Sequence, residues 1–80
     1  MTVTLLLFAS YADALGTSSV ELDVAPGATV ADVLARVRRI DGADRLPPAV
    51  LVAVNEQYAR GEQVLRAGDE VALIPPVAGG

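Results

Sequence analysis

The sequence predicts a small α+β domain in which one main helix packs on a mixed β-sheet. Three observations support this prediction: apolar runs of strand length recur along the chain, one stretch between them has helical periodicity, and Pro and Gly separate the runs. Eighty residues are enough for one domain. Since 52% of the residues are hydrophobic and only one Phe and two Tyr are present, Val, Leu, Ile and Ala must supply most of the core.

The pattern of residues 2–24 predicts two strands joined by a short connection. Residues 2–9 form an almost unbroken apolar run, which is typical of a strand buried on both faces. The connection predicts a short helical turn over residues 12–15, capped by Gly16. Residues 20–24 then alternate between apolar and acidic side chains, which predicts a half-buried strand.

The main helix is predicted from its start signal and its apolar stripe. Thr29 stands at the expected N-cap and Asp32 follows three residues later, as in a capping box with Asp in place of Glu. An amphipathic stripe follows at helical spacing, made of Val30, Val33, Leu34 and Val37. Three arginines lie at its end, where positive charge complements the helix dipole; a partner-binding role is the alternative for Arg36, Arg38 and Arg39.

The second half of the chain predicts further strands joined by polar loops. After a loop over residues 41–48, the apolar residues 49–54 predict a central strand, and residues 71–74 predict the last one. A turn at residues 55–56 and a short edge strand at residues 58–59 are expected between them. A hairpin, a crossover helix and further strands in this order predict a β-grasp domain over residues 1–74, with a projecting tail over residues 75–80.

The composition excludes several classes of function. There is no His, Cys or Lys, so the common general base, the thiol nucleophile and the amine nucleophile are missing, and no metal site is expected. A net charge of −4 disfavours binding to nucleic acid. No apolar run is long enough to span a membrane, and the first residues lack the basic region of a secretory signal, so a cytoplasmic location is expected.

The glycine pair at residues 79–80 predicts the reactive end of the molecule. Residues without side chains can pass through a narrow channel in another protein. Pro75 and Pro76 end the last strand and stiffen the exit from it. With few reactive side chains available, the α-carboxylate of Gly80 is the best remaining candidate for covalent chemistry.

Three segments of the sequence carry a resemblance: residues 7–10, residues 52–55 and residues 68–80, the last of which read GDEVALIPPVAGG. They resemble the small subunit of molybdopterin synthase, a family of ubiquitin-like sulfur carriers, and residues 68–80 are similar to the family's C-terminal motif. Residues 7–10 resemble its first strand and turn, and residues 52–55 resemble its third strand and the Asn beyond. One departure is visible: aromatic residues often precede Pro-Pro in the family, whereas Leu73 and Ile74 stand there in this chain.

The resemblance implies a sulfur-transfer function for the tail. An enzyme similar to ubiquitin-activating enzymes would use ATP to adenylate Gly80 and would convert it to a thiocarboxylate. The large subunit of molybdopterin synthase would then receive the tail, and the sulfur would pass to a pterin precursor. The chain itself binds no cofactor in this scheme, and two small subunits join two large ones. The channel and interface positions would be Leu73, Ile74, Pro75, Pro76, Val77, Ala78 and Gly79.

Several alternatives stay open at this stage. The sulfur acceptor could be a thiamine precursor or transfer RNA, the chain could be a protein modifier conjugated through Gly80, or it could be a simple β-grasp binding module. Asp69 and Glu70 either solvate a turn or meet basic residues of the activating enzyme. Phe8 is expected in the core rather than at an interface.

Overall fold

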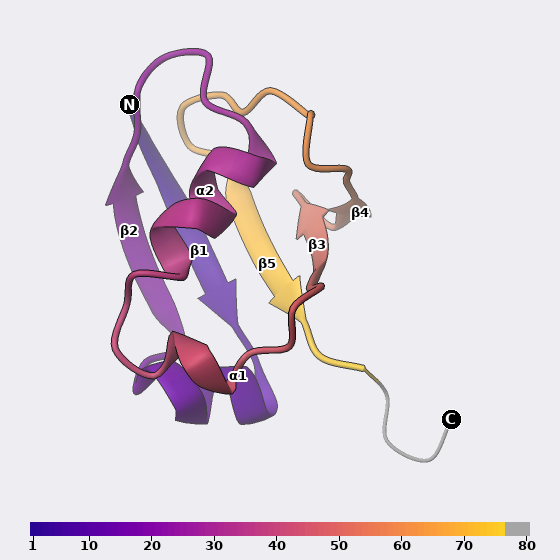
Figure 1. The fold of residues 1–80 in the computed structure, drawn as a ribbon. Coiled ribbons are helices and arrows are strands. Elements are labelled where there is room, and N and C mark those ends of the chain that lie inside the picture. Colours follow the sequence, from indigo (N-terminus) through magenta and orange to yellow (C-terminus); the bar gives the residue numbers. More distant parts are fainter. Residues whose placement is uncertain (77–80) are drawn as a thin grey trace.

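The structure is a computed structural model that describes residues 1–76, and Figure 1 shows its elements. Residues 77–80 lie outside the described part of the chain. In chain order, the elements are β1 Thr2–Leu7, α1 Ala9–Leu15, β2 Ser19–Asp23, α2 Val30–Val37, a 3-10 helix Ala43–Arg45, β3 Leu51–Val54, β4 Gln57–Tyr58 and β5 Glu70–Ile74.

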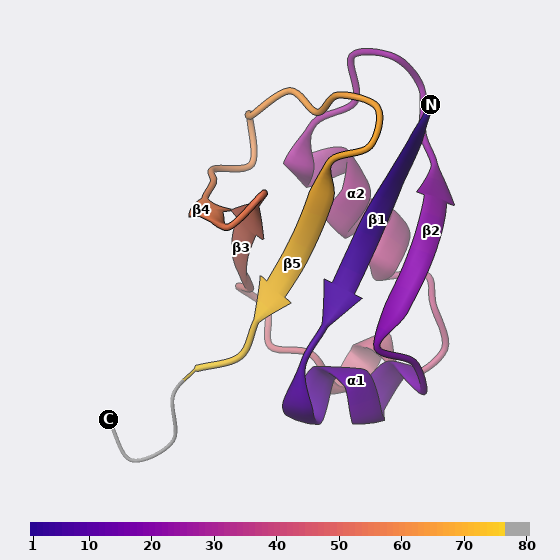
Figure 2. The ribbon, with the colours of Figure 1, turned by 180° about the vertical axis from the view of Figure 1, so that it is seen from behind.

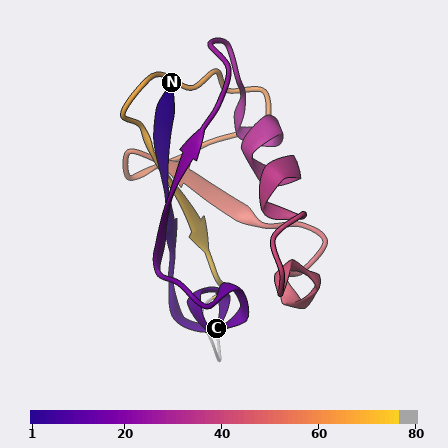
Figure 3. The ribbon, with the colours of Figure 1, turned by 90° about the vertical axis from the view of Figure 1, so that its left-hand side faces the viewer.

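The strands form one mixed sheet in the order β2-β1-β5-β3-β4. The central strand, β5, is parallel to β1, while the other neighbouring pairs are antiparallel. The edge view in Figure 3 shows α2 on one side of the sheet, and Figure 2 shows the other face with no described helix over it. This arrangement confirms the predicted β-grasp fold with one main helix on a mixed sheet. β5 ends at Ile74, whereas the division into a domain and a tail stays a prediction.

The core lies between α2 and the sheet. Alternate residues of β1 point into it, and Val3, Leu5 and Leu7 are at most 2% exposed. Their neighbours Thr4 and Leu6 are only half-buried, so the prediction that this strand is buried on both faces is wrong. The physical reason is that the described part of the chain provides helical cover for only one face of the sheet.

The helix signals in the sequence are confirmed in detail. The Thr29 hydroxyl accepts a hydrogen bond from the Asp32 amide, and the Asp32 carboxylate accepts one from the Thr29 amide. Arg38 donates to the carbonyl oxygens of Leu46, Pro47 and Pro48. This arginine therefore ties the loop after α2 to the end of the helix, which is a structural role for part of the basic cluster.

The helix after β1 is longer than predicted, and the loop after α2 contains a helical turn. The helical turn is longer than expected, since α1 begins at Ala9, and Gly16 caps it at a φ of 73° as predicted. The loop over residues 41–48 contains the 3-10 helix, which begins after Gly42. A Cβ atom at Gly42 would lie 1.9 Å from the Ala14 carbonyl oxygen, so only glycine allows these two segments to meet.

The hairpin between β3 and β4 contains a strained residue. Its two-residue turn places Asn55 at a φ of 50° and Glu56 at 72°. Both angles fit a type I′ turn, in which glycine is strongly preferred at the second central position. Glu56 carries a Cβ atom in this left-handed region, and that conformation costs about 1–2 kcal/mol.

Glu56→Gly should therefore stabilise the protein. Relief of this strain exceeds the added backbone entropy of glycine, so we expect the free energy of unfolding to rise by about 0.5–1 kcal/mol. Urea denaturation measures the change. Glu56→Ala keeps the Cβ atom and is the matched control, and an equal gain in both variants would contradict the explanation from backbone strain.

Candidate functional site

The uncovered face of the sheet carries an apolar surface that runs across four strands. Residues directly opposite each other on paired strands share a face. The register aligns Leu6 of β1 with Ala72 of β5, Ala72 with Ala53 of β3, and Ala53 with Tyr58 of β4. Two residues further along β5, Ile74 lies opposite Leu51 on the same face. We call the row Leu6, Ala72, Ala53, Tyr58, together with Leu51, Ile74 and the adjacent Phe8, the open face.

Two hollows mark the open face, and they share one residue. The first has a volume of about 350 Å³ and is lined by Leu6, Phe8, Ala53, Glu56, Tyr58, Glu70, Ala72 and Ile74. The second, of about 240 Å³, is lined by Tyr11, Pro47, Ala49, Leu51, Ile74 and Pro76. Because Ile74 lines both, apolar surface extends from β4 to Pro76, the last described residue.

The open face leaves three large apolar side chains in water. Tyr58 is 74% exposed, Leu51 52% and Phe8 47%. An apolar surface of this kind commonly marks a protein interaction site. Of the residues that line the two hollows, the charged ones are Glu56 and Glu70, and neither hollow includes an arginine. A complementary partner would therefore present apolar side chains with basic residues beside them.

A polar network at the start of β5 links this strand to the turn after β3. The Asp69 carboxylate accepts hydrogen bonds from the Arg66 amide at 2.8 Å and from the Asn55 side-chain amide at 2.9 Å. The Asn55 side-chain oxygen accepts a bond from the Glu70 amide at 2.9 Å. The bond from the Arg66 amide, and then the one from Asn55, lower the pKa of Asp69 below its ordinary value of 3.8. Asp69 is thus a turn residue, while Glu70 reaches the open face.

A family match accompanies this geometry. The model of the ThiS family matches residues 5–80, nearly the whole sequence. The chain belongs to the ThiS family. This ThiS-family chain is similar to the molybdopterin synthase sulfur carrier subunit of Chlamydomonas reinhardtii, with 32% identity over 83 residues in an alignment that covers all of both chains. Small archaeal modifier protein 1 of Haloferax volcanii is 39% identical over 83 residues, covering 92% of this chain and 95% of the relative.

Solved structures place this ThiS-family chain among ubiquitin-like proteins. The crystal structure of small archaeal modifier protein 1 from Haloferax volcanii aligns over all of both chains, with a TM-score of 0.82 and 33% identity. A chain in the complex of subunits 1 and 2 of molybdopterin-converting factor from Helicobacter pylori shares the fold, with a TM-score of 0.77 at 20% identity over the full length of both chains. The predicted resemblance to ubiquitin-like sulfur carriers is confirmed.

The predicted site residues of this ThiS-family chain fall into three groups. Leu73 is 0% exposed and packs in the core, so its assignment to the partner interface is not supported. The reason is that successive residues of a strand point to opposite faces, and Leu73 points to the face that α2 covers. Ile74 and Pro75 are half-buried, Pro76 is exposed, and Ile74 and Pro76 line the hollows. The remaining predicted positions lie outside the described residues: Val77, Ala78, Gly79 and Gly80.

Sequence reasoning missed most of the open face. Phe8 was expected in the core and is instead 47% exposed, because it follows the last inward residue of β1. Leu51 and Tyr58 were not singled out either. A usable signal was present: a single predicted helix can cover only one face of the sheet, so the apolar residues in the opposite phase of each strand had to remain uncovered.

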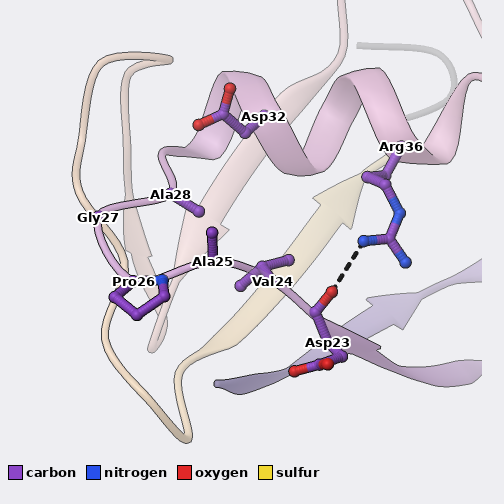
Figure 4. A pocket seen from close by; sticks show the side chains of 8 residues that line it. All are labelled: Asp23, Val24, Ala25, Pro26, Gly27, Ala28, Asp32 and Arg36. Atoms are coloured by element: carbon purple, nitrogen blue, oxygen red, sulfur yellow. Dashed lines mark hydrogen bonds between the residues drawn. The ribbon is translucent and has the colours of Figure 1, made fainter.

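A third hollow lies away from the open face, in the loop between β2 and α2 (Figure 4). The polar groups there already have partners, since Asp32 caps α2 and Arg36 donates to the Asp23 carbonyl oxygen at 2.8 Å. Residues 1–76 contain no cluster of His, Cys, Asp or Glu that could hold a metal ion. None of the helices in this part of the chain has the length and apolar character needed to cross a bilayer.

The Asp69 network predicts a pH-dependent stability. Because the pKa of Asp69 is lowered in the folded state, its contribution is fully present above the ordinary value of 3.8 and is lost as the pH falls through the folded value. We expect Asp69→Asn to be less stable than the wild type at pH 7, with a difference that narrows below pH 3.8. Denaturation at several pH values measures this. Asp44→Asn, a change on the 3-10 helix, is the control, and a difference independent of pH would contradict the prediction.

Proposed function

We propose that this protein carries sulfur on the C-terminal carboxylate of Gly80 and delivers it in molybdopterin synthesis, as the small subunit of molybdopterin synthase. The observation that carries the proposal is the open face, whose second hollow reaches Pro76, four positions before Gly80 in the sequence. Membership of a sulfur-carrier family and the named relatives in Chlamydomonas reinhardtii and other organisms support it.

The chemistry assigns the catalytic work to partner enzymes. The Gly80 carboxylate attacks the α-phosphorus of ATP on an activating enzyme and releases pyrophosphate, which gives an acyl-adenylate. A hydrosulfide ion supplied on that enzyme then forms the new C–S bond, AMP leaves with the electrons of the broken C–O bond, and loss of the sulfur proton leaves a thiocarboxylate. No His, Cys or Lys of this chain takes part, since it has none. Held in the active site of the large subunit, the sulfur would face the pterin precursor at high effective molarity.

The open face is the proposed docking surface for the large subunit. Burial of Phe8, Tyr58 and Leu51 against apolar partner residues would remove area from water that the free protein leaves exposed. Glu56 and Glu70 would pair with basic residues at the rim. The complex of subunits 1 and 2 known for the Helicobacter pylori relative supports this partnership. The proposed assembly contains two small and two large subunits.

Phe8→Ala tests the docking surface. Aromatic side chains often dominate interface energetics, so we expect the affinity for the large subunit to fall at least about tenfold, while the free energy of unfolding changes by less than about 1 kcal/mol. Titration calorimetry with the purified large subunit gives the affinity. Val64→Ala truncates another exposed apolar residue, which is outside the open face, and should leave the affinity unchanged. Equal losses in both variants would reject the assignment.

A second candidate function is protein modification. The 39% identity to small archaeal modifier protein 1 favours it, and the same Gly80 carboxylate would then form amide bonds with lysines of target proteins. Since this chain has no lysine, a second copy could not be added to a side-chain amine of the first. Intact-mass analysis of protein from its own host separates the two candidates: oxygen-to-sulfur exchange at Gly80 supports sulfur transfer, and high-mass conjugates that disappear without Gly80 support modification.

A further inference from the structure

The outer edge of β2 is a strand edge that could accept another chain. β2 pairs with β1 on one side only, and it stands at the end of the strand order. Exposed edges of this length present unpaired backbone groups and are common sites of strand addition between copies of a protein. The other edge strand, β4, contains only two residues and therefore has fewer backbone groups with which a second chain could pair.

The hydrogen-bond pattern identifies which backbone groups face outward from β2. The Leu7 amide donates to the Ser18 carbonyl, and the Val24 amide donates to the Met1 carbonyl. In an antiparallel pair, bonded and non-bonded positions alternate. The amides and carbonyls that face away from β1 therefore belong to Ser19, Glu21 and Asp23.

Thr17 closes one end of this edge. Its hydroxyl donates to the Ser19 carbonyl oxygen at 2.9 Å, and the same oxygen atom, Oγ1, accepts from the Ser19 amide at 3.3 Å. One side chain thus occupies both outward backbone groups of Ser19. An incoming strand would have to displace it before it could pair there.

Arg36 closes the other end. Its Nη1 donates to the Asp23 carbonyl oxygen at 2.8 Å, as Figure 4 shows with a dashed line from α2 to the end of β2. A neighbouring strand would have to displace this bond before it could pair with the Asp23 carbonyl. The edge has six outward backbone groups, one amide and one carbonyl from each of Ser19, Glu21 and Asp23. Thr17 and Arg36 bond three of them: both groups of Ser19 and the carbonyl of Asp23.

Glu21, between the two closed ends, opposes pairing by its charge. It is the one residue of the edge whose outward amide and carbonyl are both left without a bond from Thr17 or Arg36. Two copies that paired antiparallel through these groups would place one Glu21 directly opposite the other. Like charges at directly opposed positions destabilise a strand pair.

We propose that Thr17, Glu21 and Arg36 form an edge guard that prevents β2 from pairing with β2 of a second copy of this chain. The guard closes the backbone groups at both ends of the edge and places like charges at its centre. Contact with other proteins would then use the open face, where side chains rather than unpaired backbone groups are exposed.

A triple variant, Thr17→Val with Glu21→Thr and Arg36→Gln, tests the guard. The matched control is Ser18→Ala with Glu62→Thr and Arg39→Gln, which removes one hydroxyl and the same charges at sites outside the guard. We expect the guard variant to dimerise at least about tenfold more tightly than the control in sedimentation equilibrium at up to about 1 mM protein. A folded guard variant that associates no more than the control would overturn the proposal.

Hydrogen exchange on the wild type provides a measurement that does not depend on whether the triple variant folds. We expect the Ser19 amide to exchange more slowly than those of Glu21 and Asp23, because only the first is bonded to Thr17. Thr17→Val alone should remove the protection of Ser19. In the dimer of the guard variant, the backbone amide at position 21 should become protected. Equal and rapid exchange of all three amides in the wild type would show that the guard contacts do not form in solution.

Discussion

Deletion of Gly80 is expected to lower sulfur transfer by more than about 100-fold while the fold persists. Loss of one residue withdraws the reacting carboxylate by up to about 3.5 Å, and a misplacement of about 1 Å can already cost about 100-fold in rate. The buried residues of the described chain extend no further than Leu73, so we expect the free energy of unfolding to change by less than about 0.5 kcal/mol.

Single-turnover transfer with a purified activating enzyme and large subunit measures this effect. Gly79→Val should give a similar loss, because a branched side chain would obstruct a channel shaped for glycine. Ala78→Gly removes only a methyl group and is the control, with activity expected within about threefold of the wild type. If the deletion variant transferred sulfur at the wild-type rate, the carboxylate of Gly80 would not be the carrier group.

The neighbouring residues Leu73 and Ile74 should respond to substitution in opposite ways. Leu73 is 0% exposed in the core, and Leu73→Ala is expected to lower the free energy of unfolding by about 2–5 kcal/mol. That is a large part of the roughly 5–15 kcal/mol that stabilises a typical domain. Ile74 lies on the open face, so Ile74→Ala should cost less stability and weaken binding to the large subunit instead.

Two measurements on each variant separate these roles. Urea denaturation gives the stability, and titration with the large subunit gives the affinity at a temperature where both variants are folded. Leu73→Met, which keeps a similar volume, should recover most of the stability lost in Leu73→Ala. A weaker affinity in a fully folded Leu73→Met variant, with normal affinity in Ile74→Ala, would reverse the assignment of the two residues.

The elements that depend on local signals could be predicted from the sequence. Thr29 and Asp32 mark the start of α2, and the structure contains the capping box that they predict. Gly16 ends α1 as expected, and β5 ends at the residue before Pro75. In each case, the atoms that interact are only a few residues apart, so the sequence contains both partners within one short window.

The candidate site was harder to predict because it depends on contacts between distant segments. Whether Phe8 is buried depends on where α2 lies, and the role of Asp69 depends on Asn55, which is fourteen positions away. The exposure of Leu73 and Ile74 depends on the phase of β5 against β1 and β3. No local pattern fixes that phase, since both residues are large and apolar.

The place of β5 in the sheet has a consequence for biosynthesis. Of the described strands this one is made last, yet it lies between β1 and β3 and joins the two halves of the sheet. While a ribosome is still extending the chain short of Ile74, β1 and β3 have no strand between them to complete their pairing. Folding of the sheet should therefore wait until residues 70–74 have emerged from the exit tunnel, and a product that terminates before them should be left open to proteases.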